Sequence, residues 1–177
     1  RWAAEEGYCQ ANPARKLREP KLGKIVPKAL SEEDTIILQE ACRSPLEHAL
    51  VEFFYSTGCR IGEVHRLNRG AIDWDNRSCI VLGKGSKERE VYFSIKAAIW
   101  LKKYLNSRKD TDMALFVTER KPHRMSIAEI RYIIKRVAKR SEVESNVYPH
   151  KLRHSYATHL LNQGAPMEGI QTLMGHA

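Results

Sequence analysis

Between residues 71 and 93 the hydrophobic pattern of this chain changes from the period of a helix to that of a strand. Three short segments there are rich in β-branched and aromatic residues, and they cover residues 71–74, 79–82 and 89–93. Turn-forming residues separate them at 75–77 and at 83–88. Strands this short, joined by turns this tight, predict a three-stranded antiparallel meander.

Helical periodicity governs the chain on both sides of this block. Ser31 followed by three acidic residues is typical of a helix N-cap, Gly58 and Gly164 are stop signals, and Pro149 is typical of a first helical turn. We expect helices over residues 31–43, 46–57, 60–67, 95–106, 126–140, 150–163 and 166–174. The sequence therefore predicts an α+β domain that is mainly α with one small antiparallel sheet.

The first 28 residues differ in composition from the rest. Residues 1–8 resemble the end of a helix stopped by Gly7, and residues 12–27 are basic and interrupted by prolines. We interpret residues 1–28 as the end of a preceding domain and a basic linker, and residues 29–177 as a second domain. A disordered N-terminal tail is the alternative interpretation.

The charge of the chain indicates a polyanionic partner. Thirty Lys and Arg residues against 21 Asp and Glu residues give a formal net charge of +9, with a pI near 9.5. Such a charge attracts nucleic acid, although many basic proteins have other functions, so charge alone identifies nothing. No apolar run is long enough to span a bilayer and the first residues lack the apolar core of a signal peptide, so we expect a soluble, cytoplasmic protein.

The cysteines predict neither a disulfide framework nor a zinc site. Cys9, Cys42, Cys59 and Cys79 lie far apart and form no C-x-x-C pair. We expect them to be small apolar residues in a reducing compartment, and we expect no metal.

Arg60 and Glu63 form the first candidate site. They follow the Gly58 turn three residues apart, on one face of a predicted helix start, where an arginine can bind phosphate beside the helix N-terminus. Taken alone, such a pair is more often a surface salt bridge.

Lys84 is the second candidate. It stands between Gly83 and Gly85 at the tip of the predicted hairpin, where glycines let the backbone approach a nucleic-acid groove closely. A solubilising turn is the alternative interpretation.

His150 and Arg153 form the third candidate, in the first turn of a predicted helix, where their three-residue spacing places both on one face. His150 and His154 also have the i, i+4 spacing of zinc ligands, but Lys151 stands where H-E-x-x-H has glutamate. The chain then closes on Gly175 and His176, which in isolation are only a helix C-cap signal.

The order of these elements is more informative than any one of them. T-G-x-R-x-x-E, G-K-G-x-K-E-R, H-x-L-R-H-x-x-A-T-H-L and L-M-G-H follow one another between residues 57 and 176. This succession resembles the tyrosine recombinase, or phage integrase, family, over about residues 28–177. The resemblance implies the catalytic-domain fold of that family, preceded by the end of its core-binding domain and a linker, with no cofactor.

The resemblance also implies roles for single residues. Arg60 and Arg153 would clamp the scissile phosphate, Lys84 would protonate the leaving 5′-oxygen, and His150 would assist proton transfer. His176 would support the phosphate, and Glu63 would hold the geometry of the site. Basic residues expected to contact DNA are Lys87, Arg89, Lys151, Arg15 and Lys16.

The family's nucleophilic tyrosine would follow the Gly-His motif, and this chain stops at Ala177. We expect Tyr148 and Tyr156, which flank the motif helix, to be packing residues rather than nucleophiles. The chain is therefore predicted to be truncated before its nucleophile and to bind duplex DNA without cutting it. The full-length protein is expected to cleave and rejoin DNA through a 3′-phosphotyrosine without metal, as a tetramer on DNA and away from membranes.

Two other functions fit part of the pattern. A DNA-binding module with no catalytic role would explain the charge but not the order of the motifs. A type IB topoisomerase would share the chemistry of DNA cleavage through a phosphotyrosine. The basic linker and the residues of the motifs favour a recombinase instead.

Overall fold

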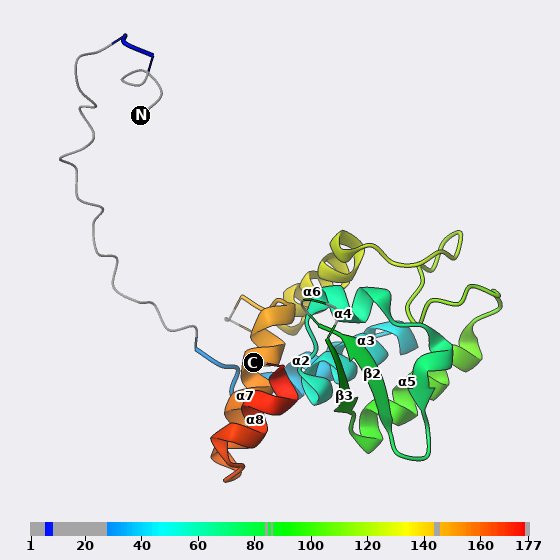
Figure 1. Cartoon of the computed structure of the whole chain (residues 1–177). Coiled ribbons are helices and arrows are strands. Elements are labelled where there is room, and N and C mark those ends of the chain that lie inside the picture. The colour runs from blue at the N-terminus through cyan, green and yellow to red at the C-terminus, as the bar shows by residue number, and fades with distance from the viewer. Residues whose placement is uncertain (1–5, 9–27, 84, 86, 144–145, 176–177) are drawn as a thin grey trace.

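We describe a computed structural model of the chain, which covers residues 6–8, 28–83, 85, 87–143 and 146–175. The elements in order are α2 (Glu32–Glu40), α3 (Pro45–Thr57), α4 (Ile61–Arg66), the 3₁₀ turn η2 (Arg69–Ala71), β1 (Ile72–Asp73), β2 (Ser78–Leu82), β3 (Glu88–Tyr92), α5 (Ile95–Ser107), α6 (Ile127–Ser141), α7 (Pro149–Asn162) and α8 (Met167–Met174). The predicted class, mainly α with one small antiparallel sheet, is confirmed (Figure 1).

The predicted helix over 31–43 was too long at its C-terminal end. α2 ends at Glu40, because Ser44 must adopt an extended backbone to cap α3. The Ser44 side chain accepts a hydrogen bond from the Glu47 backbone N–H at 3.2 Å. The other helices begin and end within two residues of the predicted bounds.

Helix α3 is the centre of the molecule. It packs against α5, α6 and α7, which lie around it in Figure 1. Its aromatic residues Phe53 and Phe54 are fully buried, and Phe53 contacts Phe93 at the end of the sheet and Phe116 in the following loop. One continuous core therefore joins the helices to the sheet.

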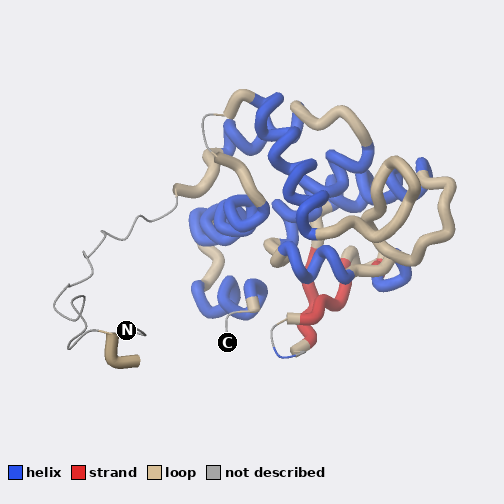
Figure 2. The backbone as a smooth tube through the Cα atoms, turned by 90° about the horizontal axis from the view of Figure 1, so that it is seen from above, coloured by secondary structure: helices blue, strands red, loops and turns tan. Residues whose placement is uncertain are grey.

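The sheet has the order β1-β2-β3 and is antiparallel throughout. Figure 2 shows its strands gathered at one side of the helical body. Cys79 and Val81 alternate with exposed Ile80 and Leu82, so one face of β2 packs on the core and the other faces solvent. This places the turn between β2 and β3 at the edge of the molecule.

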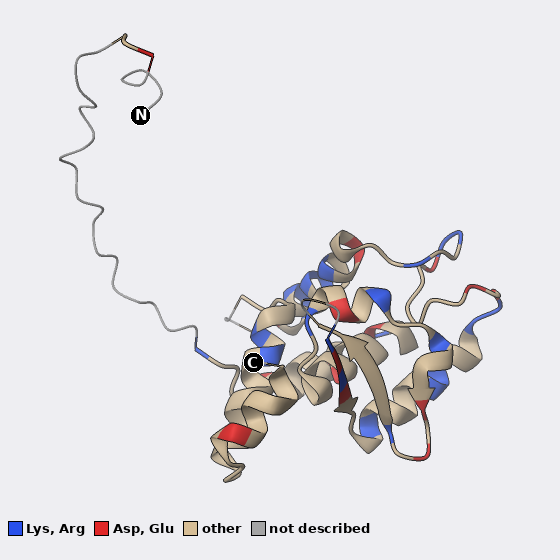
Figure 3. Cartoon of the chain, viewed as in Figure 1, with Lys and Arg blue, Asp and Glu red and all other residues tan. Residues whose placement is uncertain are grey.

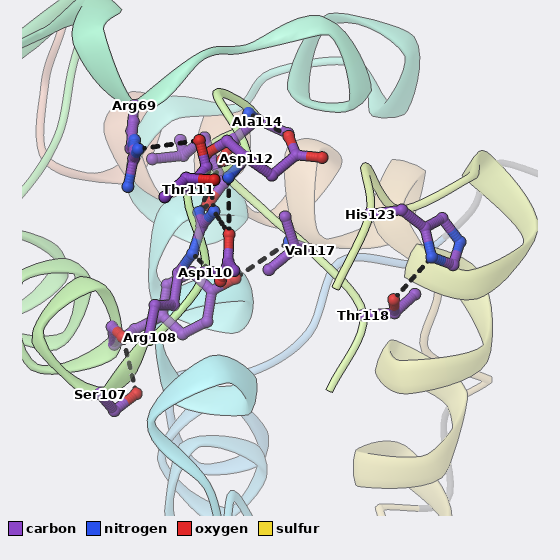
Figure 4. Close-up of polar contacts among 12 residues, drawn as sticks. Arg69, Ser107, Arg108, Asp110, Thr111, Asp112, Ala114, Val117, Thr118 and His123 are labelled. Atoms are coloured by element: carbon purple, nitrogen blue, oxygen red, sulfur yellow. Dashed lines mark hydrogen bonds and ion pairs between the residues drawn. The ribbon is translucent and has the colours of Figure 1, made fainter. Parts of the chain in front are cut away.

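A tightly bonded loop connects α5 to α6. Arg108, the C-cap of α5, begins this loop (Figure 4), and its guanidinium donates to the Asp110 carboxylate and, at 2.6 Å, to the carbonyl of Ala114. Leu115 and Phe116 are thereby held in the core. Within the part of the chain that the structure describes, no helix is both long and apolar enough to cross a membrane.

The proposed division at residue 28 stays a prediction. Of residues 1–27 only 6–8 are described, and Gly7 there has the left-handed backbone expected of a stop signal (φ 77°). Cys42, Cys59 and Cys79 are buried free thiols, and Cys9 lies outside the described residues.

Candidate active site

The site begins at the turn between α3 and α4. Gly58 ends α3 in the left-handed region (φ 59°), and a Cβ there would lie 2.6 Å from the Tyr156 ring on α7. The chain can pass this close to α7 only because residue 58 is glycine. Arg60 follows in an extended conformation as the N-cap of α4, so its side chain leaves the helix at its N-terminal end.

Glu63 is the buried carboxylate of the site. Its side chain is 2% exposed, and it accepts the backbone N–H of Arg60 at 2.7 Å and the Arg60 Nη1 at 3.1 Å. Arg89 on β3 adds two donors, Nη1 at 2.6 Å and Nη2 at 2.9 Å. The alternative of a surface salt bridge is therefore wrong, since Glu63 is buried and shared by two arginines.

Burial alone would raise the pKa of Glu63. The hydrogen bonds from Arg89 and Arg60 outweigh burial, so the pKa lies below its usual value and the group is ionised at neutral pH.

Arg153 lies on α7 and is 6% exposed. It donates through Nη1 to the carbonyl of Gly58 and through Nη2 to that of Met174. Burial, and then repulsion from Arg60, lower the pKa of Arg153 to about 10, at which it stays charged near neutral pH. A buried guanidinium beside other arginines favours the arrival of an anion.

The three arginines meet at the C-terminal end of α8. Arg89 Nε donates to the carbonyl of Leu173 at 3.1 Å, Arg153 to that of Met174, and Arg60 Nη2 to that of Gly175 at 3.2 Å. Three consecutive carbonyls therefore hold guanidinium groups from β3, α7 and α4. The predicted pair Arg60 and Arg153 is brought together here, with Glu63 beneath them.

Of the three other predicted catalytic residues, only His150 lies within the part of the chain that the structure describes. His150 is exposed in the first turn of α7, one turn before Arg153. Lys84 and His176 lie outside the described residues, but each adjoins a described neighbour: Gly83 N–H donates to the carbonyl of Lys87 at 2.8 Å to close the hairpin, and Gly175 accepts from Arg60.

The predicted DNA contacts have different surroundings. Lys87 is exposed on the hairpin and Lys151 is half-buried on α7, whereas Arg15 and Lys16 lie outside the described residues. Arg89 requires a correction, because its side chain is 13% exposed and its guanidinium nitrogens are bonded to Glu63 and Leu173. It is part of the interior of the site rather than a surface contact.

The zinc alternative has no support from the geometry. Among the described residues, no group of three or more His, Cys, Asp or Glu side chains could hold a metal ion. A zinc site needs at least three protein ligands.

The sequence analysis predicted neither the bonds of Arg89 within the site nor the part played by the carbonyls of α8. Arg89 looks like one more basic residue of a charged hairpin, and only its alternation with Val91 on β3 could have placed it on the inner side of the sheet. Backbone carbonyls leave no sequence signal at all.

Guanidinium groups that converge on one point, beside a buried carboxylate that orients two of them, have the chemistry needed to bind a phosphate group. The sequence pattern of the phage integrase family matches residues 28–177 of the chain. The chain belongs to this family, that of the tyrosine recombinases.

Curated relatives agree with this assignment. The chain is 34% identical over 183 residues to tyrosine recombinase XerC of Proteus mirabilis, covering 99% of this chain and 60% of that protein. It is 38% identical to tyrosine recombinase XerC of Oceanobacillus iheyensis (99% and 62%) and 37% identical to tyrosine recombinase XerD of Ralstonia nicotianae (99% and 61%). The chain thus spans about three fifths of the length of these relatives.

Solved structures show the same fold. XerA recombinase matches with a TM-score of 0.79 at 32% identity, over 85% of this chain and 57% of that one. A lambda integrase dimer bound to a core site matches with a TM-score of 0.76 at 18% identity, over 99% and 66%. The second likeness concerns the fold alone.

Proposed function

We propose that this chain is the catalytic domain of a site-specific DNA recombinase, which cuts and rejoins duplex DNA through a 3′-phosphotyrosine. The observation that carries the proposal is the convergence of Arg60 and Arg153 at the end of α8, with Glu63 beneath them. Relatives named tyrosine recombinases, and a lambda integrase bound to its core site, support DNA as the substrate.

The chemistry of the site suits a phosphodiester. Arg60 and Arg153 would hold the nonbridging oxygens, since guanidinium forks bind such oxygens in pairs and stay charged. Each would stabilise the charge that develops at phosphorus in the transition state. Lys84 at the hairpin would protonate the leaving 5′-oxygen, and His150 and His176 would assist from α7 and from beyond α8.

Covalent catalysis needs a nucleophile, and we propose that it comes from a segment outside this chain. Tyr156 packs on Gly58 and lines a cavity of about 440 Å³ between α3, α5 and α7, to which none of the site arginines contributes. Burial raises the pKa of Tyr156, which opposes its use as a phenolate. The chain by itself would therefore bind duplex DNA and leave it uncut.

Assembly and compartment follow as further parts of the proposal. The full-length protein would act as a tetramer on two DNA sites, associated with DNA in the cytoplasm. Three buried free thiols suit a reducing compartment.

The test compares two proteins on radiolabelled duplex carrying the recombination site, in buffer with EDTA. The longer protein, which carries the nucleophilic tyrosine, should form a denaturant-resistant covalent adduct with a 3′ end of the DNA. This chain alone should form none. Lys84→Ala should abolish the adduct while duplex binding remains, because a proton donor is lost and not the clamp. Adduct formation by the isolated chain would refute the external nucleophile, and loss of cleavage in EDTA would refute the metal-free mechanism.

A further inference from the structure

Arg89 joins three parts of the site, although it is not one of the two arginines, Arg60 and Arg153, that are proposed to clamp the phosphate. It lies on β3 just beyond the hairpin that carries Lys84, forks onto Glu63 of α4, and bonds the last turn of α8 at Leu173. A Cβ on Gly175 would approach the Arg89 side chain to 3.1 Å, so the α8 terminus lies directly against it. One side chain, that of Arg89, therefore connects the β2–β3 hairpin, helix α4 and the C-terminal end of α8.

We propose that Arg89 is a positioning residue that keeps Arg60 available to a phosphate by occupying the carboxylate of Glu63. The inference rests on the proposed function, because it assumes that Arg60 binds the phosphate. Arg89 itself would touch no DNA.

The geometry at Glu63 is unequal between the two arginines. Arg89 makes two short bonds, at 2.6 and 2.9 Å, one to each carboxylate oxygen. The Arg60 guanidinium makes a single bond, at 3.1 Å, and its other terminal nitrogen reaches Gly175. Arg89 is thus the main partner of Glu63, and Arg60 is only oriented by it.

Removing Arg89 would change what Arg60 does. A carboxylate that is 2% exposed has little access to water, so it would draw the remaining guanidinium into a two-bond pair. Arg60 would then turn from the end of α8 toward Glu63. Its capacity to bind a phosphate oxygen would be lost without any change at Arg60 itself.

The net charge of the cluster also supports a role for Arg89 in phosphate binding. Three arginines and one glutamate give +3 − 1 = +2 over Arg60, Arg89, Arg153 and Glu63. Without Arg89 the sum is +2 − 1 = +1. A phosphodiester brings one negative charge and a pentacoordinate phosphorus brings a second, so the intact cluster matches the transition state.

A double-mutant cycle in this chain tests the inference. The affinity for a fluorescein-labelled duplex is measured by anisotropy for wild type, Arg60→Gln, Arg89→Gln and the double variant. In wild type, Arg60→Gln should weaken binding about tenfold, the effect of one charge-assisted contact. In the Arg89→Gln background the same change should cost less than about twofold, because Arg60 is already withdrawn.

A matched control removes an exposed arginine of the same charge. Arg43 lies between α2 and α3 with its side chain exposed, so Arg43→Gln should leave the tenfold effect of Arg60→Gln intact. An equal Arg60 effect with and without Arg89 would overturn the inference and leave the proposed function standing. No Arg60 effect even in wild type would instead refute the proposed function, and the inference with it.

Arg89→Lys covers the case in which Arg89→Gln does not fold. Lysine keeps the charge but cannot form the two-bond fork. We expect a thermal midpoint near that of wild type, and an Arg60 effect that is again reduced to less than about twofold. If Arg89→Lys restores both wild-type affinity and the full Arg60 effect, charge alone suffices and the positioning role is refuted.

Discussion

Two buried glutamates, Glu47 and Glu63, are each held by arginines, and the two clusters differ in the elements from which those arginines come. Glu47 joins α3 to α6: its Oε1 accepts from Arg136 at 2.7 Å and from Arg140 at 2.6 Å. Both of these arginines lie on one face of α6, and both keep water contact. Basic residues gather along this helix in Figure 3.

At Glu63 the arginines come from different elements, and each also binds a carbonyl at the end of α8. Arg153, which is 6% exposed, donates to the carbonyls of Gly58 and Met174. A carboxylate with arginines on one helix face fastens two helices. A carboxylate with arginines from several elements aims their charge at one point, and the comparison teaches that burial of an ion pair alone does not reveal a site.

The largest expected effect separates the two clusters by activity. Arg153→Lys keeps the positive charge but loses the fork, so the cleavage rate of the protein with its nucleophile should fall by about 10²–10³. Single-turnover cleavage of a duplex carrying the recombination site measures this. Arg140→Lys in the other cluster is the control and should cleave at the wild-type rate; a comparable loss there would erase the distinction.

The next largest expected effect distinguishes the Glu47 cluster from the Glu63 cluster by its contribution to stability. Glu47→Gln should lower the free energy of unfolding by about 2 kcal/mol, less than for a fully buried pair because Arg136 and Arg140 remain partly solvated. Urea unfolding measures the loss, and duplex affinity should stay within about twofold of wild type. If Glu47→Gln instead impairs DNA binding without loss of stability, the cluster at α6 belongs to the functional surface.

Glutamates also differ in the pH dependence that they give to stability. Burial alone would raise the pKa of Glu47, but hydrogen bonds led by Arg140 lower it, so its stabilisation is present above the usual value of 4.5 and is lost as the pH falls through the lower folded pKa. Burial raises the pKa of Glu52, whose ionised form therefore costs stability that is recovered as the pH falls. Urea titrations from neutral pH to pH 4 and below should show opposite slopes for the differences between wild type and Glu47→Gln and between wild type and Glu52→Gln. Parallel slopes would show that Glu52 is not penalised by burial.

Much of this arrangement could be predicted from the sequence, because local signals determine it. The period change at residue 71, the Gly58 stop and the N-cap at Ser31 placed helices and strands close to where they lie. Arg60, Glu63 and Arg153 could be nominated because their spacing within helices places them at helix starts.

What could not be predicted depends on contacts between distant elements. Arg89 lies 26 residues from Glu63, and no local pattern pairs an inward-facing strand arginine with a particular distant carboxylate. The same holds for Leu30, whose backbone N–H donates to Ser155 Oγ at 2.9 Å and whose carbonyl lies 3.1 Å from His159 Nε2. These contacts attach the start of the domain to the helix that carries Arg153, and only tertiary packing brings them together.

The smallest expected effect compares the Glu47 and Glu63 clusters most directly, because it uses two arginines, one from each cluster, with similar exposure. The side chain of Arg136 is 38% exposed and that of Arg60 is 34% exposed, and each binds a glutamate whose side chain is 2–3% exposed. Arg136→Gln should cost only about 0.5 kcal/mol of unfolding free energy, since Arg140 still neutralises Glu47 and solvent screens the lost pair. Thermal and urea unfolding would register this loss, while duplex affinity should remain that of wild type. Arg60→Gln, at almost equal exposure, should show the reverse pattern, because its partner orients it toward a phosphate instead of fastening it to a neighbouring helix.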